Sequence, residues 1–248
     1  MRKRANRRQR AQLSVIGKVF FSILIIGGLA ACAKSASSST SNTNLLTYMS
    51  VMNVAPYSSP AQLFLNGQQA TGSVGPGSFS NSYAHLTPGS YDVKFKVYGA
   101  DSTLAALPAS NYDSMGFYTL ILYNDSIHGP AEALKITDDF STISLSSSFL
   151  RFFHMCLELP AVDLYLNGTP VIQNRVAKDI VPNETLTKFQ PIASGFYNLQ
   201  IKKAGTDSVI GNLNSVTLQS GNAYTIFLSG SATNSQNPIS LNIVQAVY

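Results

Sequence analysis

The chain has 248 residues, which is enough for two modest domains. Its formal net charge of +5 arises within residues 1–31, which contain seven of the 17 Lys and Arg and no acidic residue. From residue 32 onward 10 basic residues face 12 acidic ones, so this composition argues against nucleic-acid binding. Abundant Ser, Thr, Gly and Asn, without long helix-forming runs after residue 35, favour an all-β protein.

Residues 1–31 are predicted to be a cleaved lipoprotein signal peptide. A basic start precedes an apolar stretch, residues 19–26, and then small residues. The end of this segment, Leu29-Ala30-Ala31-Cys32, resembles the bacterial lipobox, in which the cysteine carries diacylglycerol. The alternatives are a plain signal peptide and a membrane-spanning anchor. The apolar run is short for a spanning helix and is not followed by basic residues.

Residues 32–44 form a polar, low-complexity segment that is predicted to act as a flexible tether between the lipid and the folded part. The expected location is therefore the cell envelope. The domains would be anchored to the outer membrane by lipid and either periplasmic or exposed on the surface.

A repeated motif organises the rest of the chain. Leu63-Phe64-Leu65-Asn66-Gly67 returns as Leu164-Tyr165-Leu166-Asn167-Gly168, each an alternating apolar run that ends in a hairpin-type Asn-Gly turn. The offset of 101 residues becomes 106 after five extra residues in the second copy. Further matches at that offset pair Gly89 with Gly195 and Tyr118 with Tyr224.

The repeat predicts two domains, 45–139 and 149–248, joined by a linker at 140–148. Each is expected to be an immunoglobulin-like β-sandwich, with a small open barrel as the alternative. In the first domain we expect strands at Tyr48–Ala55, Gln62–Asn66, Ser82–Leu86, Ser90–Tyr98, Phe117–Asn124 and near Leu134–Thr137. In the clearest of these, Tyr91, Val93, Phe95 and Val97 share the buried face.

Phe152-Phe153-His154, followed by Pro160 and then Val162-Asp163-Leu164-Tyr165-Leu166-Asn167-Gly168, resembles the opening of domain of unknown function 4397. The glycine-aromatic turns at 86–91 and 194–197 are also similar to that family, so the resemblance covers both repeats. The first copy departs from the pattern, with Asn53 in place of the histidine and Gln62 in place of the aspartate. The resemblance implies bacterial envelope proteins with immunoglobulin-like folds and no established activity.

One group could support covalent catalysis. His154, Cys156 and Glu158 alternate on one face of a predicted strand, so His154 and Cys156 define a candidate Cys–His hydrolase site. The matching residues of the first repeat, Asn53, Ala55 and Tyr57, could not perform this chemistry. Cys156 also lies in an apolar strand, so core packing is the favoured interpretation. With Cys32 lipidated, Cys156 has no partner for a disulfide.

Other site types lack their patterns. His85 and His128 have no metal-ligand spacing, and Asp138-Asp139 lacks the alternating oxygen ligands of a calcium loop. Hydrolase, phosphate-binding and dinucleotide motifs are missing as well. No metal and no cofactor is predicted.

Two aromatic residues are candidates for a ligand-facing surface. Most of the 12 Tyr and 13 Phe occupy inward strand positions, among them Tyr91, Phe95, Tyr197 and Phe227. Phe64 and Tyr165 instead lie opposite the leucines of their motif and face either solvent or the neighbouring domain. Asp163, in the same segment as Tyr165, is the third residue assigned to this surface.

Four Asp-Ser pairs resemble an O-glycosylation sequence used in one Gram-negative phylum. The acceptor serines would be Ser102, Ser114, Ser126 and Ser208. Ordinary turn chemistry also explains Asp-Ser pairs.

Taken together, these features predict a lipid-anchored, non-enzymatic binding or structural module of the cell envelope, with a glycan or protein partner. An envelope hydrolase that uses His154 and Cys156 is the alternative.

Overall fold

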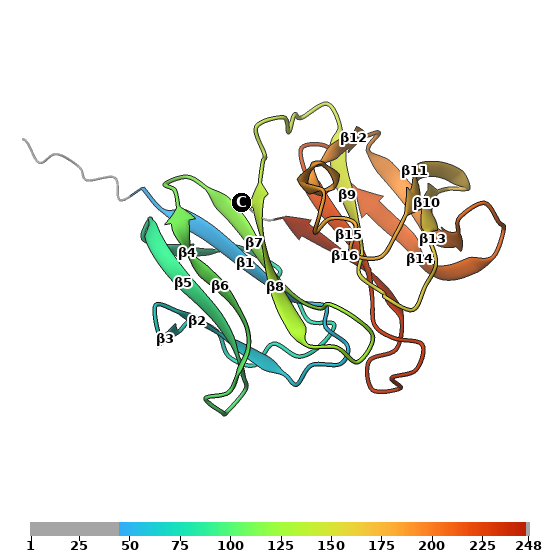
Figure 1. Cartoon of the computed structure of the whole chain (residues 1–248). Helices are drawn as coiled ribbons and strands as arrows, with labels where there is room; N and C mark the ends of the chain where they lie inside the picture. Colours follow the sequence, from blue (N-terminus) through green and yellow to red (C-terminus); the bar gives the residue numbers. More distant parts are fainter. Residues whose placement is uncertain (1–44, 247–248) are drawn as a thin grey trace, which may run out of the picture. The chain divides into compact units, whose positions relative to one another are not determined.

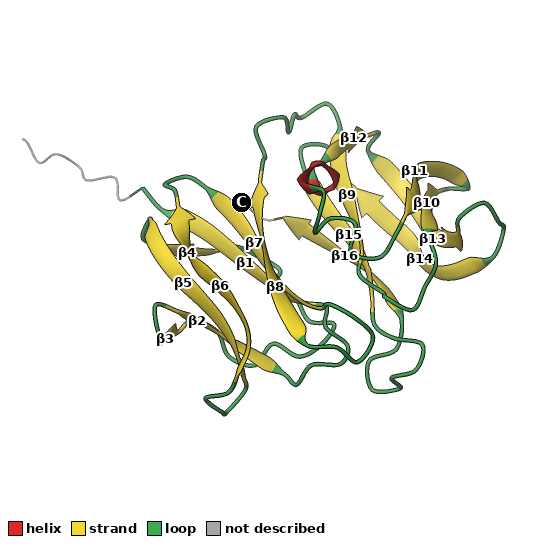
Figure 2. Cartoon of the chain, viewed as in Figure 1, coloured by secondary structure: helices red, strands yellow, loops and turns green. Residues whose placement is uncertain are grey.

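The computed structural model describes residues 45–246, in which nearly all regular structure is β (Figures 1 and 2). The first repeat contains β1 (Thr47–Asn53), β2 (Ala61–Leu65), β3 (Gln68–Gln69), β4 (Ala84–Leu86), β5 (Gly89–Val97), β6 (Thr103–Tyr112), β7 (Phe117–Asn124) and β8 (Ala131–Asp138). The second contains β9 (Ser148–His154), β10 (Val162–Leu166), β11 (Thr169–Arg175), the 3-10 helix η1 (Glu184–Thr187), β12 (Gln190–Ile192), β13 (Gly195–Lys203), β14 (Val209–Leu218), β15 (Ala223–Ser229) and β16 (Ser240–Ala246).

Each repeat is a sandwich of two four-stranded sheets with the same topology. The first repeat has the orders β4-β1-β7-β8 and β3-β2-β5-β6, and the second has β12-β9-β15-β16 and β11-β10-β13-β14. In both, the first strand pairs in parallel with the seventh, β1 with β7 and β9 with β15, while the other pairs are antiparallel. The prediction of two tandem β-sandwiches is confirmed.

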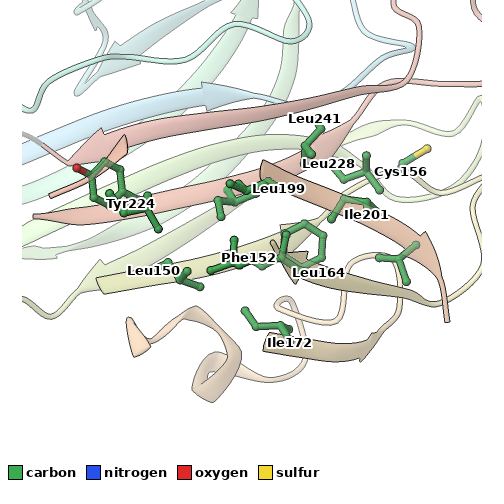
Figure 3. Packing of buried hydrophobic residues seen from close by; sticks show 14 residues of the cluster. Leu150, Phe152, Cys156, Leu164, Ile172, Leu199, Ile201, Tyr224, Leu228 and Leu241 are labelled. Atoms are coloured by element: carbon green, nitrogen blue, oxygen red, sulfur yellow. The ribbon is translucent and has the colours of Figure 1, made fainter. Parts of the chain in front are cut away.

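Alternating apolar side chains from both sheets fill the core of each sandwich. Val93 and Phe95 of β5 are almost fully buried against Leu120 and Leu122 of β7. The core of the second sandwich is shown in Figure 3, which labels Leu150, Phe152, Cys156, Leu164, Ile172, Leu199, Ile201, Tyr224, Leu228 and Leu241. Since successive strand residues point to opposite faces, each core uses only one face of its sheets.

One sheet of each repeat is buried on its second face as well. Every residue of β9 and β15 is buried, a pattern that one-sided packing does not produce. A separate apolar cluster explains it, because Met52 and Ile121 of the first repeat pack with Phe153 and Phe227 of the second. We call β4-β1-β7-β8 and β12-β9-β15-β16 the inner sheets and the other two the outer sheets. Phe227, expected in the core of its own repeat, is fully buried between the repeats instead.

A buried ion pair also joins the inner sheets. Arg151 of β9 contacts Asp138 of β8 at 2.5 Å, and both side chains are almost completely buried. Arg151 also donates to Thr225 at 2.8 Å, while Asp138 accepts from Tyr83 at 2.6 Å and from Thr119 at 2.5 Å. Burial and the neighbouring Asp138 carboxylate raise the pKa of Tyr83, so its hydroxyl remains a donor. These partners satisfy two charges that would otherwise be costly to bury.

The two Asn-Gly turns have the predicted hairpin geometry. Asn66 and Gly67 have φ angles of 48° and 78°, and Asn167 and Gly168 have 49° and 80°. The Asn66 side chain accepts from the Asp92 amide at 2.8 Å, and that of Asn167 accepts from the Asn198 amide at 2.8 Å. Each asparagine therefore shapes a turn and also fixes the adjacent strand.

Candidate functional site

The lipidation prediction at Cys32, with the signal peptide and tether around it, lies outside the described residues. Within residues 45–246 no helix is both long and apolar enough to cross a membrane.

Phe64 and Tyr165 lie on the exposed face of the outer sheets, opposite the sandwich cores. Both are half-buried, because a lysine of the adjacent strand lies over each ring. The ammonium group of Lys96 is 4.5 Å from the Phe64 ring centroid, and that of Lys202 is 4.6 Å from the Tyr165 centroid. Such cation–π contacts hold the aromatic ring in a fixed orientation.

An aspartate holds each of these lysines. Lys96 forms an ion pair with Asp101, and Lys202 with Asp207 at 3.2 Å. The hydrogen bond from Lys96 lowers the pKa of Asp101. Both repeats thus carry the same aromatic–lysine–aspartate group on their outer sheet, and only the aromatic residue differs.

The second outer sheet carries further polar and aromatic side chains on the same face as Tyr165. Across β10, β13 and β14, Tyr165 is in register with Gln200, and Gln200 with Asn212. Phe196 of β13 points to the same face by strand alternation and is 78% exposed. We call Tyr165, Phe196, Gln200 and Asn212 the outer platform. The equivalent row of the first repeat is Gln69, Phe64, Lys94 and Ala106, so a lysine and an alanine stand where the second repeat has Gln200 and Asn212.

Sequence reasoning identified Tyr165 but not the other members of the outer platform. Phe196 belongs to the glycine-aromatic turn, and its exposure follows from alternation with Tyr197, which packs into the core. Gln200 and Asn212 are ordinary polar residues, so only the strand register shows that they lie beside Tyr165.

Asp163 has a different environment from Tyr165. It is 6% exposed, and its carboxylate accepts from the backbone amides of Asn174 at 2.7 Å and Gly205 at 3.4 Å. Gln62, its counterpart, donates to the carbonyls of Val97 and Ala100 at 3.4 and 3.5 Å. Both side chains tie a strand to neighbouring loops, which favours a structural role for Asp163.

His154 has both ring nitrogens engaged. The Cys156 amide donates to Nδ1 at 3.4 Å, and Nε2 lies 3.2 Å from the carbonyl oxygen of Pro160. Nδ1 is therefore the acceptor, and Nε2 carries the proton that it donates to Pro160. Burial lowers the pKa of His154, and the bond to Pro160 only partly opposes this. The ring is held neutral inside the protein.

Cys156 is fully buried among Leu228, Ile201 and other core residues (Figure 3). Burial raises the pKa of its thiol, which disfavours the thiolate that a nucleophile requires. The contact between the two residues is the backbone amide of Cys156 with His154, not its sulfur. This geometry does not assemble an activated nucleophile.

Glu158, the third residue of that group, belongs to a contact between the repeats. Its carboxylate accepts from Ser231 at 2.6 Å, from the amides of Ala232 and Thr233 at 2.7 and 3.1 Å, and from the Tyr57 hydroxyl. Burial acts to raise the pKa of Glu158, but the bonds from Ser231, Tyr57 and Thr233 and from the Ala232 amide outweigh it and lower this pKa to about 2.

The four serines predicted to be glycosylated are all exposed, and they lie in turns between strands: Ser102, Ser114, Ser126 and Ser208. Three of the preceding aspartates are engaged in ion pairs, namely Asp101 with Lys96, Asp125 with Lys178 and Asp207 with Lys202. Among the residues that the structure describes, no group of three or more His, Cys, Asp or Glu is arranged to hold a metal ion.

Comparison with known proteins agrees with the repeat. No curated protein matches the chain. The family model described as "Domain of unknown function (DUF4397)" matches twice, over residues 47–165 and 148–245. These two matches span both sandwiches. The chain therefore belongs to the DUF4397 family and contains that domain in tandem.

Proposed function

We propose that this protein is a non-enzymatic binding module of the cell envelope, anchored to the outer membrane through lipid on Cys32, and that the outer platform is its binding surface. A glycan is the partner class that fits this surface best. The exposed ring of Phe196, the half-buried ring of Tyr165 and a row of neutral amides on one sheet face match the needs of a sugar, whose ring stacks on aromatic faces and whose hydroxyls pair with amides.

The row formed by Tyr165, Gln200 and Asn212 with Phe196 carries this proposal. Asn212 is exposed, and its side-chain amide donates to the side-chain oxygen of Asn214 at 3.3 Å, which leaves the Asn212 oxygen to accept from a ligand. The exposed ring of Phe196 does not contribute to the hydrophobic core, and aromatic residues are enriched at binding surfaces. The first repeat has Lys94 and Ala106 in place of these two amides, and Gln69, the amide in its row, donates to the Thr71 carbonyl, so we assign binding to the second repeat.

The environments of His154 and Cys156 support a module without catalysis. The histidine is neutral and engaged at both nitrogens, and the thiol is buried with a raised pKa. A hydrolase of the Cys–His type needs an accessible thiolate next to a free imidazole.

The test is binding of the Cys32→Ala chain to a panel of bacterial envelope polysaccharides and to purified envelope proteins. For a glycan that binds, Tyr165→Ala and Phe196→Ala should each weaken binding by roughly 30-fold, the effect of removing an aromatic anchor. Phe64→Ala, the matched change in the first repeat, should leave binding within about threefold. Binding to a protein alone, or equal effects of Phe64→Ala and Tyr165→Ala, would refute the glycan platform.

Two further measurements test the anchor and the absence of catalysis. Cys32→Ala should move the protein from the membrane fraction to the soluble fraction. In that variant Cys156 is the only thiol, since the chain has two cysteines. A thiol reagent should label Cys156 only after unfolding. Rapid labelling of the folded protein, abolished by His154→Ala, would favour the hydrolase instead.

A further inference from the structure

The two repeats bury the same face against each other. The 101-residue offset extends to the loop after the Asn-Gly hairpin, where the Gly77 amide donates to the Asn53 carbonyl at 2.8 Å and the Lys178 amide donates to the His154 carbonyl at 2.8 Å. Both loop residues also have positive φ angles, 79° and 61°. Equivalent residues can therefore be assigned through position 180.

Equivalent residues of the two repeats lie in one buried cluster at this face. The Phe79 ring of the first repeat meets the Phe227 ring of the second edge-on, with centroids 5.3 Å apart. Their counterparts, Ile180 of the second repeat and Ile121 of the first, belong to the same buried cluster. Such reciprocity defines an isologous interface, the type that two-fold homodimers use.

Two equivalent loops also meet directly. Tyr57 and Glu158 correspond at the 101-residue offset, and the Tyr57 hydroxyl donates to the Glu158 carboxylate. An interface that brings corresponding loops together places them near a pseudo-two-fold axis.

The ion pair breaks this symmetry. Arg151 corresponds to Ser50 at the 101-residue offset. The counterpart of Asp138 follows from strand register. Asp138 lies opposite Phe117, and Ala246 lies opposite Ala223. Since Phe117 corresponds to Ala223, Asp138 corresponds to Ala246. The symmetry-related version of the ion pair would thus consist of a serine and an alanine.

We propose that this face is a pairing surface whose partner is a second domain of the same kind, that it holds without the covalent link, and that Arg151 and Asp138 determine which domains pair. Two second repeats would bury Arg151 opposite alanine. Two first repeats would bury Asp138 opposite serine. A buried charge without its counterion is strongly unfavourable, so only unlike repeats pair.

This inference does not depend on the proposed glycan site and is tested without a ligand. A protease recognition sequence is inserted into the full-length Cys32→Ala chain between Ser144 and Leu145, both exposed, and the folded protein is then cut. The two halves should elute together at a 1:1 ratio on size exclusion at micromolar concentration and separate only in denaturant. Separation of the halves without denaturant would overturn the pairing surface.

Variants of the cut protein test the role of the ion pair. Arg151→Met leaves the Asp138 carboxylate without its counterion and should weaken association of the halves roughly 100-fold or more. Asp138→Asn combined with Arg151→Met removes both charges and keeps an acceptor for Tyr83 and Thr119, so association should return to within about tenfold of the original. Lys94→Met removes an exposed ion pair of the outer sheet and is the control, with no change expected.

Tagged and untagged cut proteins are mixed in denaturant, which is then removed, so that the halves can exchange partners and show which repeats pair. In the double variant, tagged second halves should capture untagged second halves, because neither pairing buries a charge. With Arg151 and Asp138 intact, they should capture first halves only. Two outcomes would refute the assignment of specificity to this ion pair. One is that pairs of identical halves form equally in both proteins, and the other is that they form in neither protein.

Discussion

Asn53 and His154 end the first strand of their repeats, and each accepts from an equivalent amide and donates to a carbonyl at a different position of its repeat. Asn53 accepts from the amide two residues later, that of Ala55, at 3.1 Å and donates to the Val74 carbonyl at 2.9 Å. His154 accepts from the amide of Cys156 and donates to the carbonyl of Pro160. The comparison shows that this position requires an acceptor and a donor in a fixed orientation. A histidine beside a cysteine is one way to supply them.

The largest expected effect on stability is that of replacing Arg151, which we compare with replacing its counterpart Ser50. In the intact chain Arg151→Met should lower the free energy of unfolding by about 3–5 kcal/mol, because it leaves a buried carboxylate without its counterion. Ser50→Ala removes a neutral hydrogen bond to Thr119 and should cost about 1 kcal/mol. Urea denaturation of both variants measures the contrast, and equal losses would contradict it.

Exchanging the strand-end residues tests whether their roles are the same. His154→Leu leaves the Cys156 amide and the Pro160 carbonyl without their partners and should cost about 1–3 kcal/mol. His154→Asn can accept again from the Cys156 amide, as Asn53 does from the Ala55 amide, and should recover part of that loss. If the asparagine variant is no more stable than the leucine variant in urea, the two positions are not interchangeable.

The difference between His154 and Asn53 also predicts how stability depends on pH. The pKa of folded His154 lies below its ordinary value of 6.5. Above pH 6.5 the ring is neutral in both folded and unfolded chains. As the pH falls below 6.5 the unfolded chain binds the proton first, so the free energy of unfolding decreases. His154→Asn should reduce this loss between pH 6.5 and 5, as measured by the urea midpoint. An unchanged pH profile would assign the effect to other groups.

Glu158, whose counterpart in the first repeat is Tyr57, makes stability depend on pH in a lower range. The pKa of Glu158 is lowered from 4.5 to about 2, so its contribution is complete above pH 4.5 and is lost as the pH falls towards 2. Glu158→Gln should make the protein less stable at pH 6 but change its stability little near pH 2. Thermal unfolding at both pH values tests this, and an equal shift at both would contradict it.

The smallest effects should come from Lys96 and Lys202, the lysines of the two aromatic–lysine–aspartate groups. Lys96→Met and Lys202→Met each remove an ion pair with an exposed aspartate and a cation–π contact, so each should lower the urea midpoint only slightly and to the same extent. A large loss in only one repeat would show that the aromatic–lysine–aspartate groups are not equivalent.

Sequence periodicity predicted the strands that have alternating or strongly apolar patterns. Phe117–Asn124 coincides with β7, and the predicted strand at Ser90–Tyr98 lies within one residue of β5 at each end. The ten-residue strand β6 was missed, because Thr103–Tyr112 contains Pro108 together with alanine and asparagine, which are weak strand formers. β6 is an edge strand, where proline is tolerated.

The contacts between the repeats could not be predicted from the sequence. The apolar run of β9 indicates burial on both faces but does not reveal what covers the second face. Arg151 sits within this run, between Leu150 and Phe152, and its partner Asp138 lies at the end of another strand. Only the packing of the inner sheets brings these two residues together. The repeat offset located Asn53, His154, Tyr57 and Glu158 as pairs, but not the contact between the last two.

The shared face between the inner sheets has a consequence for biogenesis. The first repeat is synthesised before the second, and β1 must wait for β7 before it can pair, so even this half folds slowly. Once folded, it exposes Met52, Val54, Ile121 and Ile136 until the second repeat arrives to cover them. Exposed apolar surface on a folding intermediate promotes aggregation. We therefore expect chains truncated after the first repeat to depend on chaperones far more than the full chain does.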